Sequence, residues 1–260
     1  MYKIYWMDGR MDCPAQQDHS VFPGPLLMII IKDIQLSNIF PCPYIDGRTA
    51  RFAYFHAFEL DERDLEQFLA KGWRKFGAYF FRPMCLQCRS CSPIRVKVQD
   101  FRLRKSQRKI IRRNALTSVE FKPLSYSDEI FDIYVDHSIR RFNNHDTDKD
   151  DFQNSFFFAS CPSLQSEYYY NGKLAAAGFL DCSSHGLSSV YFVFHNDYKK
   201  LGLGVFSMCK EIEYARKLGL EHYYLGYYIR ENASMAYKNR FCPHQHLDWS
   251  TMQWADCRTC

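Results

Sequence analysis

The sequence predicts an α+β protein with two domains: a small cysteine-containing domain, then a larger one built from strands around a long helix. The 260-residue chain is 47% hydrophobic and 17% aromatic, which is enough for ordinary cores and excludes a disordered protein. A basic, cysteine-containing stretch ends near residue 115, where the composition becomes acidic. We therefore expect residues 28–118 and 119–260 to form separate domains.

The first domain follows a leader. Residues 1–27 show no sustained hydrophobic period and contain three prolines, so we expect no regular structure there. Alternating aromatic residues predict an extended segment over Thr49–His56. A helical stripe of apolar residues predicts a helix over Glu59–Lys71, and a short strand is expected over Tyr79–Arg82.

The second domain begins with acidic sequence over Ser127–Asp151, of which Asn143–Asp151 has the composition of a loop. Beyond it, hydrophobic periods predict three strands, a helix and a further strand, over Ser166–Tyr170, Leu174–Asp181, Ser188–His195, Gly202–Leu218 and Tyr223–Tyr228. Antiparallel strands followed by a helix and a strand are the order of half an acyltransferase-type fold.

A glycine-containing turn, Lys199–Gly204, connects the last of the three strands to the long helix. A helix N-terminus offers unpaired N–H groups and the positive end of its dipole to a phosphate. The spacing basic-x-x-Gly-x-Gly resembles the pyrophosphate loop of the GNAT acyltransferases. We expect Lys199, Gly202 and Gly204 to bind phosphate or an acyl donor; a tight strand–helix turn is the alternative.

The charge is unevenly distributed. Residues 71–113 hold fourteen Lys and Arg against one acid, a net charge of +13, and because the whole chain carries +5 the remainder carries −8. Such separation is typical of a surface that binds a polyanion. Residues 105–114 read as a helix with a basic face, and we expect RNA phosphates to be bound by the basic residues Arg104, Lys105, Arg108, Lys109, Arg112 and Arg113.

Four of the eleven cysteines have the spacing of metal ligands. Cys85, Cys88 and Cys91 follow a C-x-x-C-x-x-C pattern, and Cys42 lies between two prolines. Four thiolates can hold zinc, and this dense spacing is equally compatible with an iron–sulfur cluster. Three reduced thiols without metal are the alternative.

Neither a membrane span nor a signal peptide is predicted. The longest apolar run is six residues, far below the roughly 20 that cross a bilayer. The first 25 residues lack the charged and small-residue features of a signal peptide. We expect a cytoplasmic protein without a membrane partner.

Several sequence blocks follow one another over about residues 40–248: Cys42–Arg48, Gly72–Gly77, Arg82–Arg95, Arg104–Asn114, Gly186–Tyr191, Tyr224–Ile229 and Met235–Pro243. In content and order they resemble the arginyl/leucyl-tRNA–protein transferase family in its short bacterial form. The resemblance implies transfer of an amino acid from aminoacyl-tRNA to proteins with N-terminal Asp or Glu, which tags them as N-degrons for proteolysis. The short form usually transfers leucine, and arginine is the alternative.

An acidic N-terminus requires a positive pocket, and guanidinium groups bind carboxylates bidentately. The candidates are Arg48, Arg51, Arg74 and Arg82, of which Arg74 and Arg82 are favoured because they lie beside the cysteines. Tyr227, Tyr237 and Lys238 are expected to line the donor end. The ester is already activated, so alignment and oxyanion stabilisation are the main requirements, and no residue is singled out as the general base.

Two other classes of protein remain open from the residues. A small-molecule GNAT acetyltransferase would bind acetyl-CoA through Lys199–Gly204 but would have no need of the basic segment. A non-catalytic zinc RNA-binding protein would explain residues 42–113 but leave the second half without a role.

Overall fold

Residues 52–58 form an inner strand of the smaller of two sheets, and their side chains alternate between its two faces. The structure, a computed structural model, describes residues 28–31 and 33–257, so the expected leader lies outside the described part. Every second residue of β5 (Phe52–Phe58) is buried, as in a strand with one face on a core. The sheet runs β1 (Ile29–Ile30), β5, β7 (Tyr79–Pro83), β6 (Arg74–Phe76), with β2 (Gln35–Leu36) also on β5; β3 (Phe40–Pro41) pairs with β4 (Thr49–Ala50).

The helix α1 (Glu62–Ala70) covers this sheet. Asp61 begins the helix by accepting hydrogen bonds from two backbone N–H groups of the first turn. Leu65 and Leu69 are buried and pack in one cluster with Phe55, Trp73 and Phe80. The helix predicted over Glu59–Lys71 and the strand predicted over Tyr79–Arg82 both agree with the structure, within one to three residues at each end.

The larger sheet has eight strands in the order β15 (Gln253–Asp256), β14 (His244–Asp248), β8 (Ser92–Lys97), β13 (His222–Tyr228), β12 (Gly186–Phe194), β11 (Lys173–Cys182), β10 (Ser163–Tyr170), β9 (Thr117–Pro123). All neighbours are antiparallel except β12 and β13, which are parallel. This parallel pair requires a crossover, which the 3-10 helix η1 (Asn196–Leu201) and the helix α5 (Leu203–Lys217) supply.

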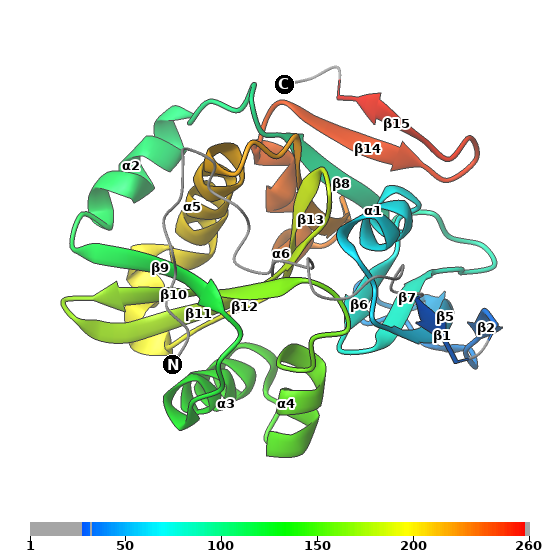
Figure 1. Ribbon diagram of the computed structural model, residues 1–260, viewed down its shortest axis with the longest axis horizontal. Coiled ribbons are helices and arrows are strands. Elements are labelled where there is room, and N and C mark those ends of the chain that lie inside the picture. The colour runs from blue at the N-terminus through cyan, green and yellow to red at the C-terminus, as the bar shows by residue number, and fades with distance from the viewer. Residues whose placement is uncertain (1–27, 32, 258–260) are drawn as a thin grey trace, which may run out of the picture.

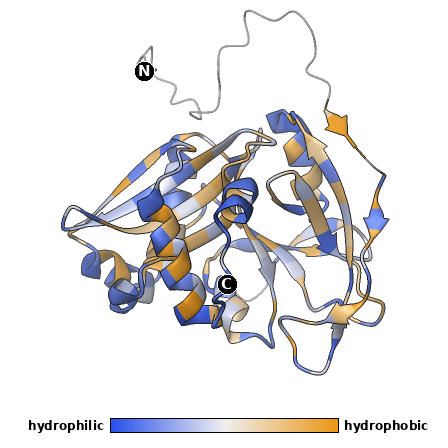
Figure 2. Ribbon diagram, turned by 90° about the horizontal axis from the view of Figure 1, so that it is seen from below, coloured by the Kyte–Doolittle hydropathy of each residue, from blue (hydrophilic) through white to orange (hydrophobic). Residues whose placement is uncertain are grey.

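Helices lie on both faces of the larger sheet (Figure 1). One face carries α5 and α2 (Lys105–Arg113), and the other carries α3 (Asp128–Phe142) and α4 (Lys149–Phe156). The short α6 (Ala233–Ala236) and the 3-10 helix η2 (Tyr237–Arg240) follow β13. Hydrophobic and hydrophilic residues alternate along the longer helices (Figure 2), as in helices with one buried side. Strand β11 is buried from Leu174 to Cys182 because both faces are covered.

Two features differ from the expectations. The sheets divide between β7 and β8, so residues 92–118, which we expected in the first domain, contribute β8, α2 and the start of β9 to the second. The change of charge near residue 115 therefore does not coincide with the division between the two sheets. The helix α3 was also not predicted, because His137 and Ser138 share its buried side with Ile130 and Ile133 and blur the apolar stripe.

In the described part of the chain, no helix combines the length and the apolar character needed to cross a membrane.

Candidate active site

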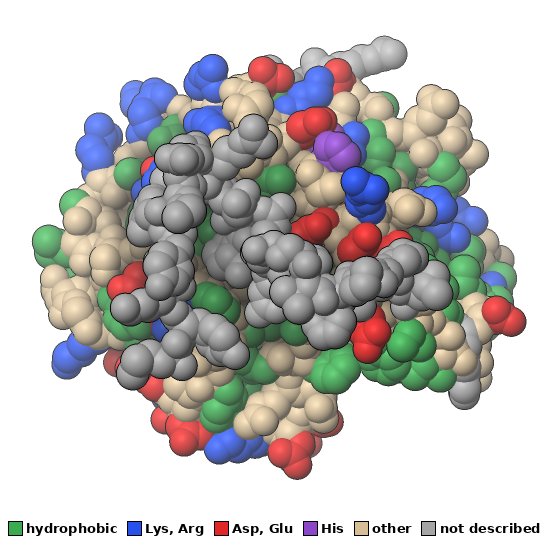
Figure 3. Space-filling view, viewed as in Figure 1, with side chains coloured by type: hydrophobic (Ala, Val, Ile, Leu, Met, Phe, Trp, Pro, Cys, Tyr) green, Lys and Arg blue, Asp and Glu red, His purple; other side chains and the backbone are tan. Residues whose placement is uncertain are grey.

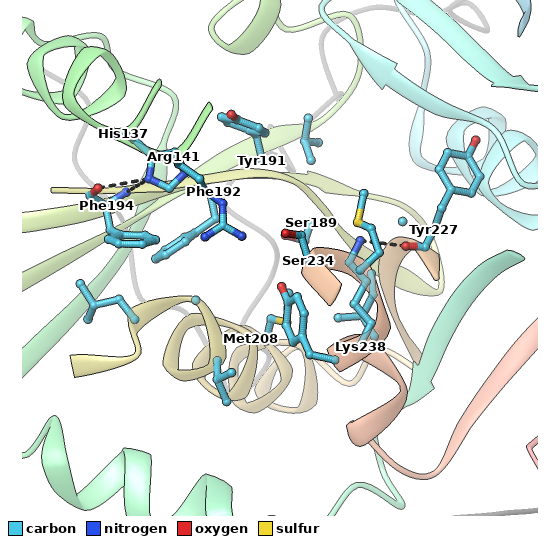
Figure 4. A pocket seen from close by; sticks show the side chains of 18 of the residues that line it. His137, Arg141, Ser189, Tyr191, Phe192, Phe194, Met208, Tyr227, Ser234 and Lys238 are labelled. Carbon is cyan, nitrogen blue, oxygen red and sulfur yellow. Dashed lines mark hydrogen bonds between the residues drawn. The ribbon is translucent and has the colours of Figure 1, made fainter. Parts of the chain in front are cut away.

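The parallel strands β12 and β13 pair over three residues and then part. Gly186, Leu187 and Ser188 face His222, Tyr223 and Tyr224, and no pairing continues beyond Ser188. A cavity of about 470 Å³ lies beyond this point, between the ends of the two strands (Figure 4). Its other walls come from β6, α3, the start of α5, and the α6–η2 segment. The divergence of two adjacent strands therefore creates the site.

The glycine turn closes one side of the cavity. Gly202 has a φ of 72°, a left-handed conformation that ends η1 and begins α5. Lys199, Gly202 and Gly204, the residues expected to bind phosphate or an acyl donor, all line the cavity. The first-turn N–H groups of α5, a 15-residue helix, provide a site suited to an anion.

Arg74 reaches the cavity from β6 of the smaller sheet. Its Nη1 donates to Ser188 Oγ at 2.8 Å, and its Nη2 donates to the carbonyl of Ser189. These bonds hold the guanidinium where β12 and β13 separate, and burial lowers the pKa of Arg74. Arg74 therefore links the two sheets at the cavity and brings a fixed positive charge to it.

The three residues expected at the donor end also line the cavity. Tyr227, Tyr237 and Lys238 contribute to the wall formed by β13 and η2. The Tyr227 hydroxyl donates to the carbonyl of Gly72 at 2.8 Å, so the phenol braces β13 against the smaller sheet. Lys238 donates from Nζ to the Tyr227 carbonyl at 3.0 Å (Figure 4).

The other three arginines expected to bind acidic N-termini do not line this cavity. Arg82 stacks its guanidinium on Trp73, 4.7 Å from the ring centroid. Arg51 donates to the Met84 carbonyl at 3.3 Å. Arg48 donates to Cys88 Sγ and Ser90 Oγ, both at 3.3 Å. Of the four candidates, Arg74 alone belongs to the cavity.

Sequence reasoning missed the wall supplied by α3. His137 and Arg141 line the cavity from this helix, one turn apart. Arg141 is exposed, lies 5.7 Å from the Phe142 ring, and has no carboxylate partner among the described residues. Because α3 was not predicted, the four-residue spacing of His137 and Arg141 could not be recognised as one turn of a helix.

The basic helix α2 is attached directly to the glycine turn. Arg113 donates to the Lys200 carbonyl at 2.7 Å, and the buried Asn114 donates from Nδ2 to the Leu201 carbonyl at 2.9 Å. Ile110 and Ile111 pack toward α5, and the residues expected to bind RNA, Arg104, Lys105, Arg108, Lys109, Arg112 and Arg113, are all exposed. Figure 3 shows Lys and Arg side chains gathered over α2. The end of α2 is therefore attached to the turn that lines the cavity.

None of these six basic side chains forms an ion pair with a carboxylate in the described part of the chain. A solvated helix face normally mixes both signs of charge. An unneutralised face of this kind is suited to a polyanion.

The four cysteines lie near one another around the β7–β8 connection. Burial raises the pKa of Cys91 to about 12, and Cys85, Cys42 and Cys88 add to the increase. Burial also tends to raise the pKa of Cys88, but hydrogen bonds from Ser90 and Arg48 bring it below its usual value. The thiol chemistry fits zinc or iron. Among the described residues, the positions of the Cys, His, Asp and Glu side chains form no group of three or more that would hold a metal ion as they stand.

Comparison with known proteins gives the family. Residues 40–109 match the model "Arginine-tRNA-protein transferase, N terminus" and residues 128–248 match "Arginine-tRNA-protein transferase, C terminus". The chain is 34% identical over 220 residues to an aspartate/glutamate leucyltransferase of Chromobacterium violaceum, covering 82% of this chain and 91% of the relative. It is 32% identical over 229 residues to the enzyme of the same name from Acinetobacter baumannii, covering 84% and 83%.

Among solved structures, L-PGS from Bacillus licheniformis matches with a TM-score of 0.45 at 12% identity, covering 66% of this chain and 54% of that one. FemX matches with a TM-score of 0.41 at 8% identity, covering 62% and 59%.

The two family models, which follow one another along this two-sheet α+β chain, define the class as a transferase that takes its amino acid from tRNA. The chain belongs to the arginine-tRNA–protein transferase family and is an aminoacyl-tRNA–protein transferase. The expected resemblance is confirmed, and membership excludes the acetyltransferase and the non-catalytic RNA-binding protein as its class.

Proposed function

We propose that this enzyme transfers leucine from leucyl-tRNA to the α-amine of proteins that begin with Asp or Glu. The names of the relatives support both the donor and the acceptor. The proposal implies a cytoplasmic enzyme that tags acidic N-termini as N-degrons, since charged tRNA and its substrate proteins meet in the cytoplasm.

The charge of the cavity wall favours leucine over arginine as the donor. Apolar side chains from α5, β12 and β13 line it, among them Met208, Phe192 and Leu225. No Asp or Glu is among the described residues of the wall, whereas Arg74, Arg141, Lys199 and Lys238 are. A buried arginyl guanidinium would require a carboxylate partner. A leucyl side chain requires apolar surface alone, and this observation carries the assignment of the donor.

The same cations suit an acidic acceptor. Arg74 keeps N–H groups beyond its two bonds to β12, because a guanidinium has five donors. Arg141 is exposed on the wall that α3 supplies and has no acidic partner in the described chain. We infer that these two residues receive the Asp or Glu side chain, and that Arg48, Arg51 and Arg82 act outside this pocket.

The tRNA would approach along α2. Phosphates along the acceptor stem would contact Arg104, Lys105, Arg108, Lys109, Arg112 and Arg113, and the glycine turn with Lys199, Gly202 and Gly204 would bind a phosphate near the 3′ end. The attachment of α2 to the turn through Arg113 and Asn114 supports this path. The aminoacyl ester would then enter between β12 and β13, beside Tyr227, Tyr237 and Lys238.

A metal on the four cysteines remains a separate proposal, and no step of the transfer depends on it. Cys42, Cys85, Cys88 and Cys91 would supply four thiolates to zinc or to an iron–sulfur cluster. Metal analysis of protein purified without oxygen tests this. We expect metal that is lost in Cys88→Ser and kept in Cys209→Ser; metal-free wild-type protein contradicts it.

The central test is a transfer assay with purified enzyme and two donors in parallel, radiolabelled leucyl-tRNA and arginyl-tRNA. The acceptors are three peptides that differ at their first residue: Asp, Asn or Ala. We expect label from leucyl-tRNA on the Asp peptide alone. Label from arginyl-tRNA would overturn the donor assignment, and equal labelling of the Asn peptide would overturn the acceptor assignment.

A further inference from the structure

Lys238 is a buried lysine without a counter-ion. Its side chain is 9% exposed, and its Nζ donates to the backbone carbonyl of Tyr227 at 3.0 Å. No carboxylate among the described residues pairs with it, and none lines the cavity that it faces. An ammonium group is costly to bury without a partner, so this environment favours the neutral amine.

A permanent positive charge strengthens this preference. The Lys238 ammonium and the Arg74 guanidinium both face Gly226: a Cβ placed there would lie 3.6 Å from Lys238 Nζ and 3.7 Å from Arg74 Nε. Arg74 cannot lose its proton in a protein. Burial first, and then Arg74, lower the pKa of Lys238 to about 7. A lysine with this pKa exchanges a proton readily near neutral pH.

The titratable groups on the elements around Lys238 are tyrosines, cations and one carboxyl. On β13 and on η2 itself, burial raises the pKa of the Tyr227 and Tyr237 phenols, the latter to about 12. Arg74 faces Lys238 from β6, and Arg141 and Lys199 line the same cavity from α3 and η1. The Glu211 carboxyl of α5 acts on Tyr237, but it is buried against Tyr168 and Tyr223, and its own pKa is raised to about 7. No carboxylate lines the described wall of the cavity itself.

The bulge in β13 gives Lys238 its position. The register between β13 and β8 shifts between Tyr224 and Gly226, and Gly226 has a φ of 83°. Glycine adopts this left-handed backbone without strain, and β-bulges commonly re-aim groups at active sites. The carbonyl of Tyr227, the next residue, then accepts the hydrogen bond from Lys238.

We propose that Lys238 is the general base of the transfer: its neutral Nζ takes the proton of the attacking α-amine and passes it to the departing tRNA oxygen. This inference rests on the proposed aminoacyl transfer but holds for either donor amino acid. The amine nitrogen forms a bond to the ester carbonyl carbon and gives its proton to Nζ. The carbon–oxygen bond to the terminal ribose then breaks, and the proton moves from Nζ to that oxygen, which leaves the lysine as it began.

His137 is the rival base in the cavity. Burial lowers its pKa, but Nδ1 lies 3.2 Å from the Phe194 carbonyl, and the ring packs against Phe194 at the far end of β12 from the parallel pairing. Lys238 instead lies beside Gly226, where β12 and β13 have just separated. The two candidates are thus distinguishable by substitution.

Single-turnover transfer at saturating acceptor, measured from about pH 5.5 to 9, tests the proposal. Wild type should show one rise near pH 7 from Lys238 and a second from the acceptor α-amine. In Lys238→Met, which keeps the length of the side chain, we expect a rate lower by roughly 10²- to 10⁴-fold and only the second rise. Lys238→Arg, which stays charged, should be as slow. The tRNA affinity should match wild type in both variants, and unfolding curves show that each variant is folded under the assay conditions.

Three results would overturn the proposal: Lys238→Met retaining the rise near pH 7, Lys238→Arg transferring at the wild-type rate, or His137→Gln abolishing that rise. The second would mean that the charge of Lys238, and not its proton, is needed. The assay uses both leucyl- and arginyl-tRNA, so a wrong donor assignment appears as a change of the donor that wild type uses. A wrong base assignment appears as an unchanged pH profile with whichever donor is active.

Discussion

Arg74 and Arg141 face the same cavity but are held differently. Arg74 is fixed by Ser188 Oγ and the Ser189 carbonyl at the base of the strand divergence. Arg141 has an aromatic neighbour, Phe142, and is exposed. A group already held in place recognises a carboxylate with little loss of conformational entropy, whereas a free arginine must be ordered by the ligand. Arg74 therefore suits fixed orientation, and Arg141 suits closure over the acceptor side chain.

We expect Arg141→Gln to lower kcat/KM for an Asp-initiated peptide by about ten- to a hundredfold, because a hydrogen bond to a charged group contributes about 1.5–3 kcal/mol. The measurement compares peptides that begin with Asp and Asn, and the loss should be confined to the Asp peptide. Arg140→Gln is the matched control, since Arg140 is the preceding residue on α3 and lies 3.8 Å from Asp136. An equal loss with both peptides would remove Arg141 from acceptor recognition.

At the scale of elements, α2 combines an anchored side with a charged side. Its buried Gln107 and the half-buried isoleucines hold it to the larger sheet and to α5. Its exposed cations form one positively charged surface because no Asp or Glu lies between them in residues 104–113. The helix is therefore suited to bind a phosphate backbone. Contacts to phosphates do not distinguish one base from another, so α2 does not explain how a particular tRNA is recognised.

We expect Arg108→Gln/Arg112→Gln to weaken tRNA binding and to make it less dependent on salt, lowering the log–log salt slope by roughly one to two. Filter binding at several salt concentrations measures both quantities. Arg63→Gln/Lys149→Gln removes the same charge from α1 and α4, which lie away from α2 (Figure 1), and should leave the slope unchanged. Equal effects from the two pairs would mean that net charge alone matters.

The helix α5 carries a buried carboxyl that makes stability depend on pH. Burial raises the pKa of Glu211 from 4.5 to about 7, although hydrogen bonds from Tyr223 and Tyr168 act in the opposite direction. Because the folded pKa is the higher one, the folded state holds this proton longer. The free energy of unfolding should therefore fall as pH rises from about 4.5 to 7, by about 2–4 kcal/mol, and then level off.

Urea unfolding at about pH 5 and pH 8 measures this change. We expect Glu211→Gln, which cannot ionise, to lose that part of the pH dependence and to be more stable than wild type at the higher pH. The exposed Glu213→Gln on the same helix is the control. A pH dependence that is identical in wild type and Glu211→Gln would contradict the assignment.

At the scale of the whole molecule, buried polar contacts join the two sheets around the cavity. Lys75 of β6 pairs with Asp181 of β11 at 3.2 Å, and both side chains are almost fully buried. Glu66 of α1 accepts from Ser183 and Tyr224 of the larger domain. Since Arg74 crosses the same boundary, the cavity is shaped by how the two domains are held together.

We expect Lys75→Met to lower the free energy of unfolding by about 3–5 kcal/mol, because it leaves a buried carboxylate without a partner. The double variant Lys75→Met/Asp181→Leu should recover most of that loss. Lys149→Met breaks an exposed pair with Asp128 and should cost less than about 1 kcal/mol. Denaturant unfolding measures all three, and equal costs for the two single variants would contradict the buried link.

Sequence patterns predicted the elements that carry a clear period of apolar or basic residues. The strands β10 to β13, the long helix α5 and the basic helix α2 were all recognisable from residue patterns. The helix α3 was not, because a histidine and a serine complete its buried side. Periodicity also could not predict which strands pair: β8 lies between β14 and β13, although 125 positions separate the end of β8 at Lys97 from the start of β13 at His222, and β14 lies further still.

Residue patterns alone established the uneven charge, the basic helix, the glycine turn and the order of the family's blocks. The fold, in contrast, places cations from distant segments around one cavity. Arg74, Arg141 and Lys238 come from three such segments, and all line the cavity that opens where β12 and β13 part after three paired residues. The lowered pKa of Lys238 follows from its burial and from the neighbouring Arg74 guanidinium, which are properties of the fold and not of the lysine.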